Sequence, residues 1–422
     1  MQKRVLTDTR LGEKVVEAVH DSGLKILICE KKDFNSAFAI FGTKYGSIDT
    51  EFSKNGEELV RVPEGIAHFL EHKLFENEDG DAFLKYAKTG ASANAYTSFD
   101  RTCYLFGCSE KFKENLDILL DFVRKPYFSE QTVQKEQGII GQEIKMYDDE
   151  PGWCSFFNLL GAMYSNHPVK INIAGTVESI AEITDKLLYS CYHTFYNMSN
   201  MFLCIAGNVD ADGILKTVDE TVTERNVVKI ERTMFSEPES IKTAYTEQKM
   251  PVSMPIFSLG IKLKPKAEES YKNIVINEMI LDLLIGSSTD LYAELLNNKL
   301  INKSFETEYF FGRGYSALLF QGMSENPERV RDILKEELLK MQKNGIDRKV
   351  FEGIKKDYIG KCLTDWDNPE DIVSVLVDSV FTPDGPFGEM QAVAEITAED
   401  IEEKIKEINL ENISLSVIKP VE

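Results

Sequence analysis

The order of hydrophobic and polar positions predicts strands near the start of the chain and helices soon after. Residues 24–46 contain two β-favouring runs on either side of a polar break at 31–33, which predicts a pair of strands. The stretch 93–107 is rich in Thr, Tyr and Phe and predicts a further strand. Apolar residues at helical spacing predict helices over 63–75, 110–124 and 129–148.

A similar order of elements returns in the second half. The patterns predict a strand at 252–263, helices at 272–286 and 291–299, strands within 304–322, and helices at 327–344 and 348–362. The string DIL occurs at 117–119 and again at 332–334. We infer an α+β fold of two homologous halves of about 200 residues each. The expected domains are 1–221 and 247–422, joined by a polar, charged linker at 222–246.

Composition supports packed domains and excludes one class of function. Of the 422 residues, 43% are apolar and 10% are aromatic, which is enough for hydrophobic cores. The 48 Lys and Arg residues against 70 Asp and Glu give a net charge of -22, which repels a phosphate backbone over most of the surface. Nucleic-acid binding is therefore not expected.

Cysteine usage and hydropathy favour a cytoplasmic protein. The seven cysteines are scattered and never spaced as C-x-x-C, so we expect neither a disulfide framework nor a thiolate zinc site. The N-terminal residues MQKRVLTDTRLGEKV lack the apolar segment of a signal peptide, and no run of about 18 apolar residues occurs. We expect a soluble protein without N-terminal processing or membrane binding.

Two of the five histidines stand in the string HFLEH at 68–72. On a helix with about 100° per residue, His72 lies about 40° from His68 and Glu71 about 60° to its other side, while the apolar residues face away. The histidines therefore lie outside the stripe that would enter the core. Two imidazoles one turn apart can both bind a zinc ion about 2.0–2.1 Å away. Glu71 would lie beside this metal, in the position of a general base.

A catalytic zinc site needs a third protein ligand and an open position. His20, His167 and His193 are candidates, but none has a partner at ligand spacing, which favours structural or surface roles. Glu136 and Glu143 are two helical turns apart, so both carboxylates fall within about 20° on one helix face among small or apolar neighbours. They are the better candidates. A solvated acidic face is the alternative explanation of this pattern.

Several strings in the first half resemble a known family. These are GIAHFLEHKLFE (65–76), GASANAYTSFDRTCYLF (90–106), KEQGIIGQEIKMYDDEP (135–151), HPVKINIAGTVESI (167–180) and TFYNMSNMFLCIAGNVD (194–210). They resemble the insulinase/pitrilysin family of zinc metallopeptidases, whose H-x-x-E-H motif is the inverse of the thermolysin-like H-E-x-x-H. The second half resembles this family in architecture. The length of the chain and these sequence strings are similar to those of bacterial members of the processing-peptidase type, nearest to the YmfH-like proteins.

The resemblance implies a fold and a zinc site. The fold has two homologous halves, each a mostly antiparallel sheet packed by helices, as in one half of a clamshell. His68 and His72 match the zinc-binding histidines and Glu143 matches the distant carboxylate ligand. Glu71 matches the catalytic base, and Glu136 matches the acid two helical turns before Glu143 that supports the zinc ligands without binding the metal. One Zn²⁺ per chain is implied.

The resemblance also implies a substrate strand. Asn94, Ala95 and Tyr96 match the edge strand along which the family binds peptides in extended form. An exposed strand edge binds any peptide backbone through main-chain hydrogen bonds. An ordinary sheet strand is the alternative explanation of these three residues.

One segment departs from the family pattern. Catalytic members usually carry an Arg and a Tyr seven residues apart, which bind the scissile carbonyl and its developing oxyanion. The matching segment LNNKLINKS (296–304) places Asn297 and Ser304 at those positions. Arg313 and Tyr315, in the nearby FFGRGYSALLF, are possible replacement donors, although strand and turn residues of this kind are more often structural.

These observations predict a zinc-dependent endopeptidase or oligopeptidase that hydrolyses extended peptides. In this prediction His68, His72 and Glu143 hold the zinc and Glu71 activates water. The alternative is a weakly active or inactive peptidase-like subunit of a heterodimer, which recognises a partner or a precursor peptide. A peptide-binding module without metal is disfavoured by the intact motif. As partners we expect a peptide and, in a homodimer or heterodimer, a related peptidase-like subunit, with neither nucleic acid nor membrane.

Overall fold

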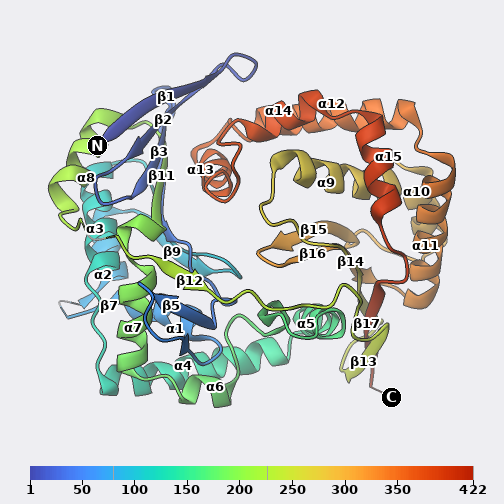
Figure 1. Cartoon of the computed structure of the whole chain (residues 1–422), viewed down its shortest axis with the longest axis horizontal. Coiled ribbons are helices and arrows are strands. Elements are labelled where there is room, and N and C mark those ends of the chain that lie inside the picture. Colours follow the sequence, from blue (N-terminus) through green and yellow to red (C-terminus); the bar gives the residue numbers. More distant parts are fainter. Residues whose placement is uncertain (79, 226, 422) are drawn as a thin grey trace. The chain divides into compact units, whose positions relative to one another are not determined.

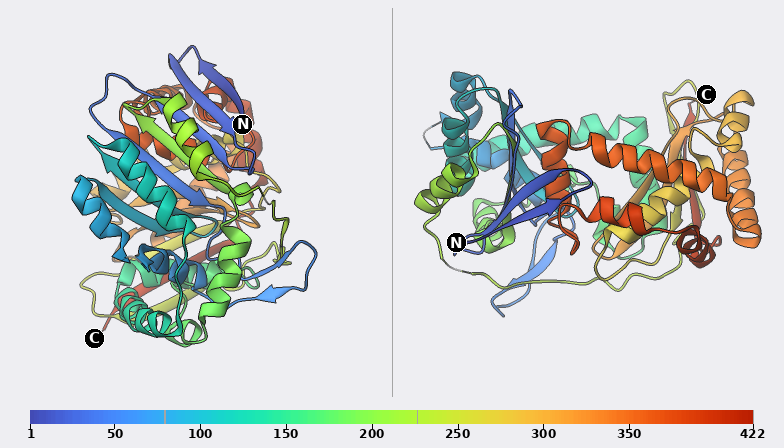
Figure 2. Two further views of the ribbon diagram at one scale, coloured as in Figure 1. Left: turned by 90° about the vertical axis from the view of Figure 1, so that its left-hand side faces the viewer. Right: turned by 90° about the horizontal axis from the view of Figure 1, so that it is seen from above.

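The computed structural model describes residues 1–78, 80–225 and 227–421. Contacts group the chain into two compact units. Unit 1 contains Met1–Ile144, Asn172–Thr233 and Leu363–Phe381. Unit 2 contains Lys145–Ile171, Met234–Cys362 and the chain from Thr382 onwards. Each unit is built on one main sheet (Figure 1 and Figure 2).

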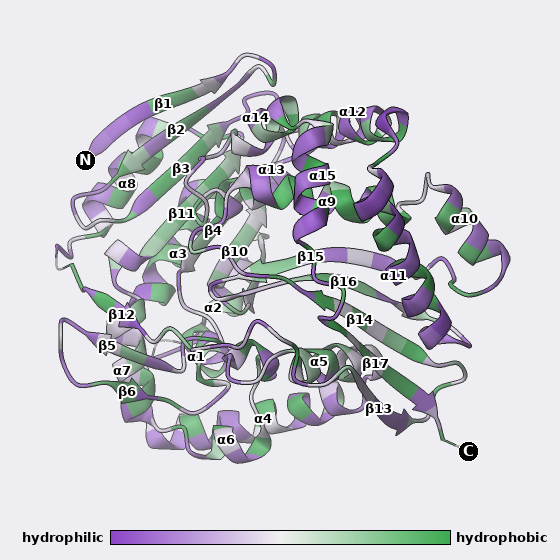
Figure 3. Cartoon of the chain, turned by 45° about the vertical axis from the view of Figure 1, so that its right-hand side comes forward, coloured by the Kyte–Doolittle hydropathy of each residue, from purple (hydrophilic) through white to green (hydrophobic). Residues whose placement is uncertain are grey.

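Unit 1 contains a seven-stranded sheet. Its strands lie in the order β1 (Gln2–Asp8), β2 (Glu13–Val19), β3 (Lys25–Glu30), β11 (Met201–Gly207), β4 (Ala37–Thr43), β10 (Thr102–Cys108) and β9 (Ser92–Thr97). Neighbouring strands are antiparallel, except that β3 and β11 are parallel. β11 is buried along its whole length because its sequence MFLCIAG has no polar face. In Figure 3, β11 is mostly hydrophobic.

Two expectations about these strands are wrong. β3 and β4, expected as a strand pair, do not pair with each other, because the fully apolar β11 takes the interior position between them. The stretch 93–107, expected as a single strand, contains most of β9 and β10. A tight turn joins them, with a hydrogen bond of 2.8 Å from the backbone N of Ser98 to the backbone O of Arg101.

Helices pack on both faces of the unit 1 sheet. On one face, α1 (Ile66–Phe75) contacts β9 and β10, α3 (Phe112–Arg124) contacts β4 and β10, and α8 (Ala211–Thr221) contacts β3. On the other face, α13 (Pro369–Asp378) contacts β4 and β11 (Figure 1). The remaining helices that begin in this unit are α2 (Ala82–Thr89), α4 (Glu130–Asp148), α6 (Val177–Ala181) and α7 (Asp185–Phe195). Two small sheets add β12 (Ile230–Arg232), β5 (Glu51–Lys54) and β6 (Val60–Arg61), and β7 (Glu76–Asn77) with β8 (Gly80–Asp81).

Unit 2 contains a five-stranded sheet. Its order is β13 (Tyr245–Met250), β17 (Ile413–Pro420), β14 (Ile256–Lys262), β16 (Tyr315–Met323) and β15 (Glu306–Gly312). Only β13 and β17 are parallel among its described strand pairs. Its helices are α5 (Pro151–Met163), α9 (Tyr271–Ile285), α10 (Asp290–Asn297), α11 (Pro327–Asn344), α12 (Arg348–Thr364), α14 (Gly388–Glu395) and α15 (Ala398–Glu407). α11 buries one apolar face and shows many hydrophilic residues in Figure 3.

The two sheets confirm the α+β fold with two homologous halves. The strand order β3-β11-β4-β10-β9 of unit 1 matches the order β13-β17-β14-β16-β15 of unit 2, and the parallel pair occupies the same place in each. Each unit also contains a helix from the other half of the sequence. α5 contacts β14 and β17 in unit 2, and α13 contacts the equivalent strands β4 and β11 in unit 1.

The segment 222–246, expected to be a linker, is partly structured. β12 within it pairs with β5, and its last residues begin β13; Asn226 lies outside the described residues. The predicted boundaries of the two domains stay a prediction. None of the described helices is long and apolar enough to cross a membrane. All seven cysteines are free thiols.

Candidate metal centre and active site

The H-x-x-E-H string lies on α1, whose start depends on a glycine. Gly65 precedes the helix and has a φ of 85°, a left-handed value that residues other than glycine rarely adopt. A Cβ at this position would lie 2.3 Å from the carbonyl oxygen of Ala174, so only glycine allows this close approach. The helix then buries Phe69, Leu70 and Leu74 in the core. This packing directs the histidines to the other side of α1.

His68 and His72 lie beside Glu143 of α4. Nε2 of His68 is 3.7 Å from Oε1 of Glu143, and Nε2 of His72 is 3.4 Å from Oε2 of the same carboxylate. One donor atom from each of the three residues lies within 4.8 Å of the others. Within the described part of the chain, no other group of three His, Cys, Asp or Glu side chains meets this criterion.

This donor set fits a zinc ion. Ligand atoms about 2.0–2.1 Å from a tetrahedral zinc lie about 3.3–3.4 Å from one another. The separations of 3.4 and 3.7 Å from Glu143 to the two imidazoles are close to that spacing. Two imidazoles with one carboxylate suit Zn²⁺ better than the all-oxygen sites of Mg²⁺ or Ca²⁺. Three protein ligands also leave a fourth position for water or substrate.

Glu136 orients His72 from the far side of the ring. Its Oε1 is 3.1 Å from Nδ1 of His72, and the side chain of Glu136 is only 10% exposed. A carboxylate on Nδ1 favours the tautomer with a free Nε2, which is the nitrogen that faces Glu143. Burial alone would lower the pKa of His72, but the hydrogen bond to Glu136 and the charges of Glu71 and Glu143 outweigh burial and raise this pKa.

His68 has a different environment. Burial, together with the nearby His72, lowers the pKa of His68 to about 3. The imidazole is therefore neutral at physiological pH, as a metal ligand must be. Its Nδ1 is buried without a hydrogen-bond partner in the described structure, while its Nε2 faces Glu143.

Glu71 is buried next to the two imidazoles. Its Oε2 accepts a hydrogen bond of 2.8 Å from the hydroxyl of Thr97 on β9. Burial raises the pKa of Glu71, and the hydroxyl of Thr97 and the charge of His72 only partly offset this effect. A carboxylate with a raised pKa accepts a proton more readily, which suits a general base.

The predicted substrate strand is β9, which forms one edge of the unit 1 sheet. Asn94 and Ala95 pair with Leu105 and Tyr104 of β10 on one side of the strand. No described strand pairs with its other side. Tyr96 is 38% exposed. The strand therefore offers an open edge, as β-augmentation requires.

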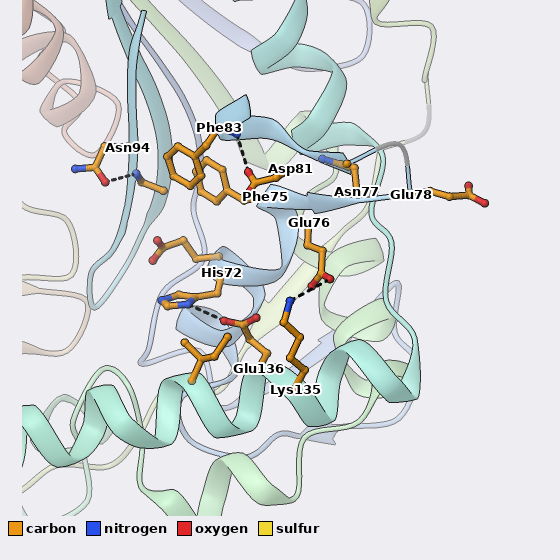
Figure 4. Close-up of a pocket in the computed structure, with 14 residues that line it drawn as sticks. His72, Phe75, Glu76, Asn77, Glu78, Asp81, Phe83, Asn94, Lys135 and Glu136 are labelled. Carbon is orange, nitrogen blue, oxygen red and sulfur yellow. Dashed lines mark hydrogen bonds and ion pairs between the residues drawn. The ribbon is translucent and has the colours of Figure 1, made fainter. Parts of the chain in front are cut away.

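A pocket of about 580 Å³ opens next to the predicted metal ligand His72 (Figure 4). The pocket is lined by Glu71, His72, Phe75, Glu76, Asn77, Glu78, Gly80, Asp81, Phe83, Asn94, Ala95, Lys135, Glu136 and Ile139. We call it the α1–β9 pocket. It connects the predicted catalytic base with the predicted substrate strand.

The other candidate histidines have partners elsewhere. The Nδ1 and Nε2 atoms of His20 lie 2.8 and 3.1 Å from the side chains of Ser22 and Asp219. His167 donates through Nε2 to the backbone oxygen of Arg313 at 2.9 Å in unit 2. The ring of His193 stacks on a tyrosine of its own helix. His20 and His167 are thus buried in structural positions, and His193 is exposed at the surface.

The residues considered as oxyanion donors lie in unit 2. Arg313 lies in the turn between β15 and β16, and Tyr315 begins β16. Tyr315 is only 3% exposed, and its ring packs against Phe310. Its use as a donor would require the hydroxyl to become accessible. Asn297 and Ser304 are both exposed. The roles of these four residues stay predictions.

Sequence reasoning missed Thr97 and Gly65. Thr97 follows directly after the predicted substrate residues, but its contact with Glu71 depends on how β9 packs against α1. Gly65 stands just before the helical pattern, and a glycine at a helix start is a signal that could have been used.

A His-His-Glu group beside a buried glutamate is the side-chain arrangement of a zinc metallopeptidase. Comparisons with known proteins identify the family. The family model for insulinase (peptidase family M16) matches residues 62–177, and the model for the peptidase M16 inactive domain matches 182–358. The uncharacterized zinc protease YmfH of Bacillus subtilis is 40% identical over 405 residues, which cover 94% of each chain. The chain therefore belongs to the insulinase family of peptidases, M16.

Comparison with solved structures supports the same family assignment. An M16-like peptidase from Alicyclobacillus acidocaldarius has a TM-score of 0.91 and 31% identity, covering 100% of this chain and 98% of its own. Pitrilysin shares the fold with a TM-score of 0.76 at 15% identity, and the match covers 99% of this chain and 46% of pitrilysin. These findings confirm the predicted family and the enzyme class.

Proposed function

We propose that the protein is a zinc-dependent endopeptidase or oligopeptidase that hydrolyses extended peptides. The observation that carries this proposal is the convergence of His68, His72 and Glu143 beside the buried Glu71. The residues supply three ligands and one proton acceptor, which together are the parts needed for metal-assisted hydrolysis.

Each of these side chains has a separate task in the proposed reaction. His68, His72 and Glu143 would hold the zinc, and Glu136 would fix the ring of His72. When bound, the zinc supplies Lewis-acid polarisation of the peptide carbonyl and of the attacking water. Glu71 would accept the proton of that water and deliver it to the leaving amine, while the hydroxyl of Thr97 holds its carboxylate in place.

The substrate would bind as an added strand along β9. Main-chain hydrogen bonds to a strand edge are independent of sequence, so side-chain pockets must supply selectivity. Asn94 and Ala95 lie both on this edge and in the α1–β9 pocket. A peptide paired with β9 would thus pass the predicted base.

A quenched fluorescent peptide library tests the proposed activity. We expect the zinc-loaded chain to cleave members of the library, a chelator to stop cleavage, and added zinc to restore it. Glu71→Gln should retain zinc and lose cleavage. Glu58→Gln removes one exposed acid from the loop between β5 and β6 and serves as the matched control. Cleavage that survives both the chelator and Glu71→Gln would contradict the proposal.

A second candidate function is that of a weakly active subunit completed by a related chain. The supporting observation is that Asn297 and Ser304 occupy the positions where Arg and Tyr are expected. Each missing oxyanion donor costs about 2.7–4 kcal/mol, or about 10²–10³ in rate, in well-studied enzymes. A lone chain would then be slow.

Co-expression with a related peptidase-like chain separates the two candidates. Activation by about 10²-fold or more would support the second candidate. Full turnover by the lone chain, unchanged by Asn297→Ala, Ser304→Ala or any related chain, would favour the first.

A further inference from the structure

The turn between β9 and β10 carries an arginine with several partners. Nη1 of Arg101 donates a hydrogen bond of 2.7 Å to Oδ1 of Asp378, and its Nε donates one of 2.9 Å to Oδ1 of Asp100. The central carbon of the guanidinium lies 3.8 Å from the ring centroid of Phe381. The side chain of Arg101 is only 18% exposed. We call Arg101, Asp100, Asp378 and Phe381 the Arg101 clamp.

The clamp joins segments that are far apart in the sequence but belong to the same unit. Asp378 is the last residue of α13 and lies 277 positions after Arg101. The end of α13 has a second anchor, because Nζ of Lys44, directly after β4, donates to the backbone oxygen of Val380 at 3.2 Å. A planar guanidinium that stacks on a ring and bonds two carboxylates has a defined geometry, unlike an ordinary surface ion pair. The clamp therefore holds the β9–β10 turn against a fixed helix end.

The backbone of this turn is fixed from another direction. The backbone N of Ile48 donates a hydrogen bond of 3.1 Å to the backbone oxygen of Phe99. A Cβ at Gly46 would lie 2.4 Å from the carbonyl carbon of Phe99, so only glycine allows this close approach. The turn is thus held by a loop through its backbone and by α13 through the side chain of Arg101.

Tyr96 of the predicted substrate strand lies beside the clamp. Burial raises the pKa of Tyr96, and the charges of Arg101 and Asp378 act on this pKa in opposite directions because both lie near the phenol. Tyr96 is nevertheless 38% exposed on β9, whose other edge has no described strand partner. A change in the clamp should therefore disturb the part of β9 that would pair with a peptide.

The predicted base has a separate support. Thr97 donates to Oε2 of Glu71, and Thr102, its partner across the strand pair, donates to the backbone oxygen of Tyr45 at 2.8 Å. The side chains of the clamp make none of these contacts. Loss of the clamp should therefore affect the substrate edge more than the base.

We propose that Arg101 is a positioning residue for substrate binding, which fixes the β9–β10 turn and Tyr96 against the end of α13 so that the open edge of β9 is preformed for a peptide. This inference rests on the proposed peptidase function. A peptide that adds to an ordered edge does not have to order that edge when it binds, so its affinity is higher. In this role Arg101 acts through β9.

The kinetics of one peptide cleaved in the library assay test this role. Arg101→Leu should raise KM by about 10-fold while kcat stays within about threefold of the wild-type value. Tenfold corresponds to about 1.4 kcal/mol, close to the entropic cost of ordering the backbone of one residue. Arg101→Lys should raise KM less than Arg101→Leu, because lysine keeps the charge but has no planar group to stack on Phe381. Asp378→Asn, which keeps Arg101 and Asp100, should raise KM by about threefold.

A matched control separates positioning from stability. Arg124 is 14% exposed and lies 2.8 Å from Glu224, away from β9 in the same unit. Arg124→Leu should lower the midpoint of thermal unfolding about as much as Arg101→Leu and leave KM unchanged. An unchanged KM in Arg101→Leu, or an equal rise of KM in Arg124→Leu, would show that the clamp only stabilises the fold and would overturn the inference. If Arg101→Leu does not fold, the KM of Asp378→Asn decides in the same way.

A binding measurement makes the result independent of turnover. Zinc-loaded Glu71→Gln and Glu71→Gln/Arg101→Leu are titrated with fluorescent peptides of the library and followed by anisotropy. We expect about 10-fold weaker binding in the double variant. Weaker binding in the double variant without any cleavage by the wild-type chain would contradict the peptidase function and support the role of Arg101 in peptide binding. Equal affinity of the two variants would overturn the inference and leave the peptidase function standing.

Discussion

The hydrogen bond between Glu136 and His72 can be tested through the affinity for zinc. Glu136→Gln keeps the size of the side chain and an oxygen that can accept from Nδ1 of His72, but removes the charge. Glu136→Ala removes both. Because the carboxylate raises the pKa of His72, its loss makes Nε2 a weaker ligand and releases the ring orientation.

The expected magnitude follows from this geometry. Loss of a carboxylate that supports a ligating histidine usually weakens metal binding by about 10–100-fold, or about 1.4–2.8 kcal/mol. The 3.1 Å contact is between side chains exposed by only 10% and 26%, so solvent screening is limited. We expect about 10-fold weaker binding in Glu136→Gln, where orientation is kept, and about 100-fold in Glu136→Ala.

Competition with a chromophoric chelator measures the zinc Kd of each variant at pH 7. Glu130→Gln, an exposed acid in the first turn of the same helix, is the matched control and should bind zinc like the wild type. Thermal unfolding of the metal-free variants checks that α4 remains folded. A zinc Kd for Glu136→Ala within about twofold of the wild-type value would refute the assigned role.

Further predictions concern catalysis, an ion pair and a glycine. Glu71→Gln should retain zinc while kcat falls by about 10²–10⁴-fold, whereas Glu143→Gln should lose zinc. Stoichiometric metal in Glu143→Gln, with none in Glu71→Gln, would reverse these two roles. Glu237→Gln should lower the free energy of unfolding of the folded chain by about 3 kcal/mol in denaturant titrations at pH 7, because it leaves the ammonium of Lys262, only 3% exposed, without its carboxylate. Burial alone would raise the pKa of Glu237, but hydrogen bonds from Lys262 and the backbone N–H groups of 165–167 lower this pKa below the ordinary 4.5. The contribution of Glu237 to the free energy of unfolding is therefore present above pH 4.5. It is lost as the pH falls through the lower pKa of the folded state. A wild-type advantage over Glu237→Gln that is the same at pH 7 and well below pH 4 would argue against this linkage. Gly65→Ala should lower the free energy of unfolding by more than Gly56→Ala. Gly56 has a similar φ of 77°, but a Cβ added there has no atom within 4 Å. Equal losses in the two variants would show that the clash with Ala174 is unimportant.

Local patterns in the sequence predicted the two helices that carry the proposed metal ligands. The apolar stripe of α1 left His68 and His72 outside the core, and the seven-residue spacing placed Glu136 and Glu143 on one face of α4. Helical period is a local property, so it could be read from one segment at a time. The pairing of α1 with α4 is not local, and the family resemblance supplied it.

Other features depend on contacts between distant segments and could not be predicted. The insertion of β11 between β3 and β4 brings together residues more than 150 positions apart. The placement of α5 on β14 and β17, and of α13 on β4 and β11, exchanges helices between the halves of the sequence. An apolar helix face has no sequence signal that identifies which sheet it covers. Glu78 and Asp81, at strands β7 and β8, line the α1–β9 pocket only because of such packing.

The most direct test of the account is an anomalous diffraction measurement at the zinc absorption edge on crystals of the chain purified without chelator. The account predicts one strong anomalous peak per chain, about 2.0–2.2 Å from Nε2 of His68, Nε2 of His72 and a carboxylate oxygen of Glu143. The absence of a peak between these three side chains, or a stoichiometric peak elsewhere in the chain, would contradict the central claim.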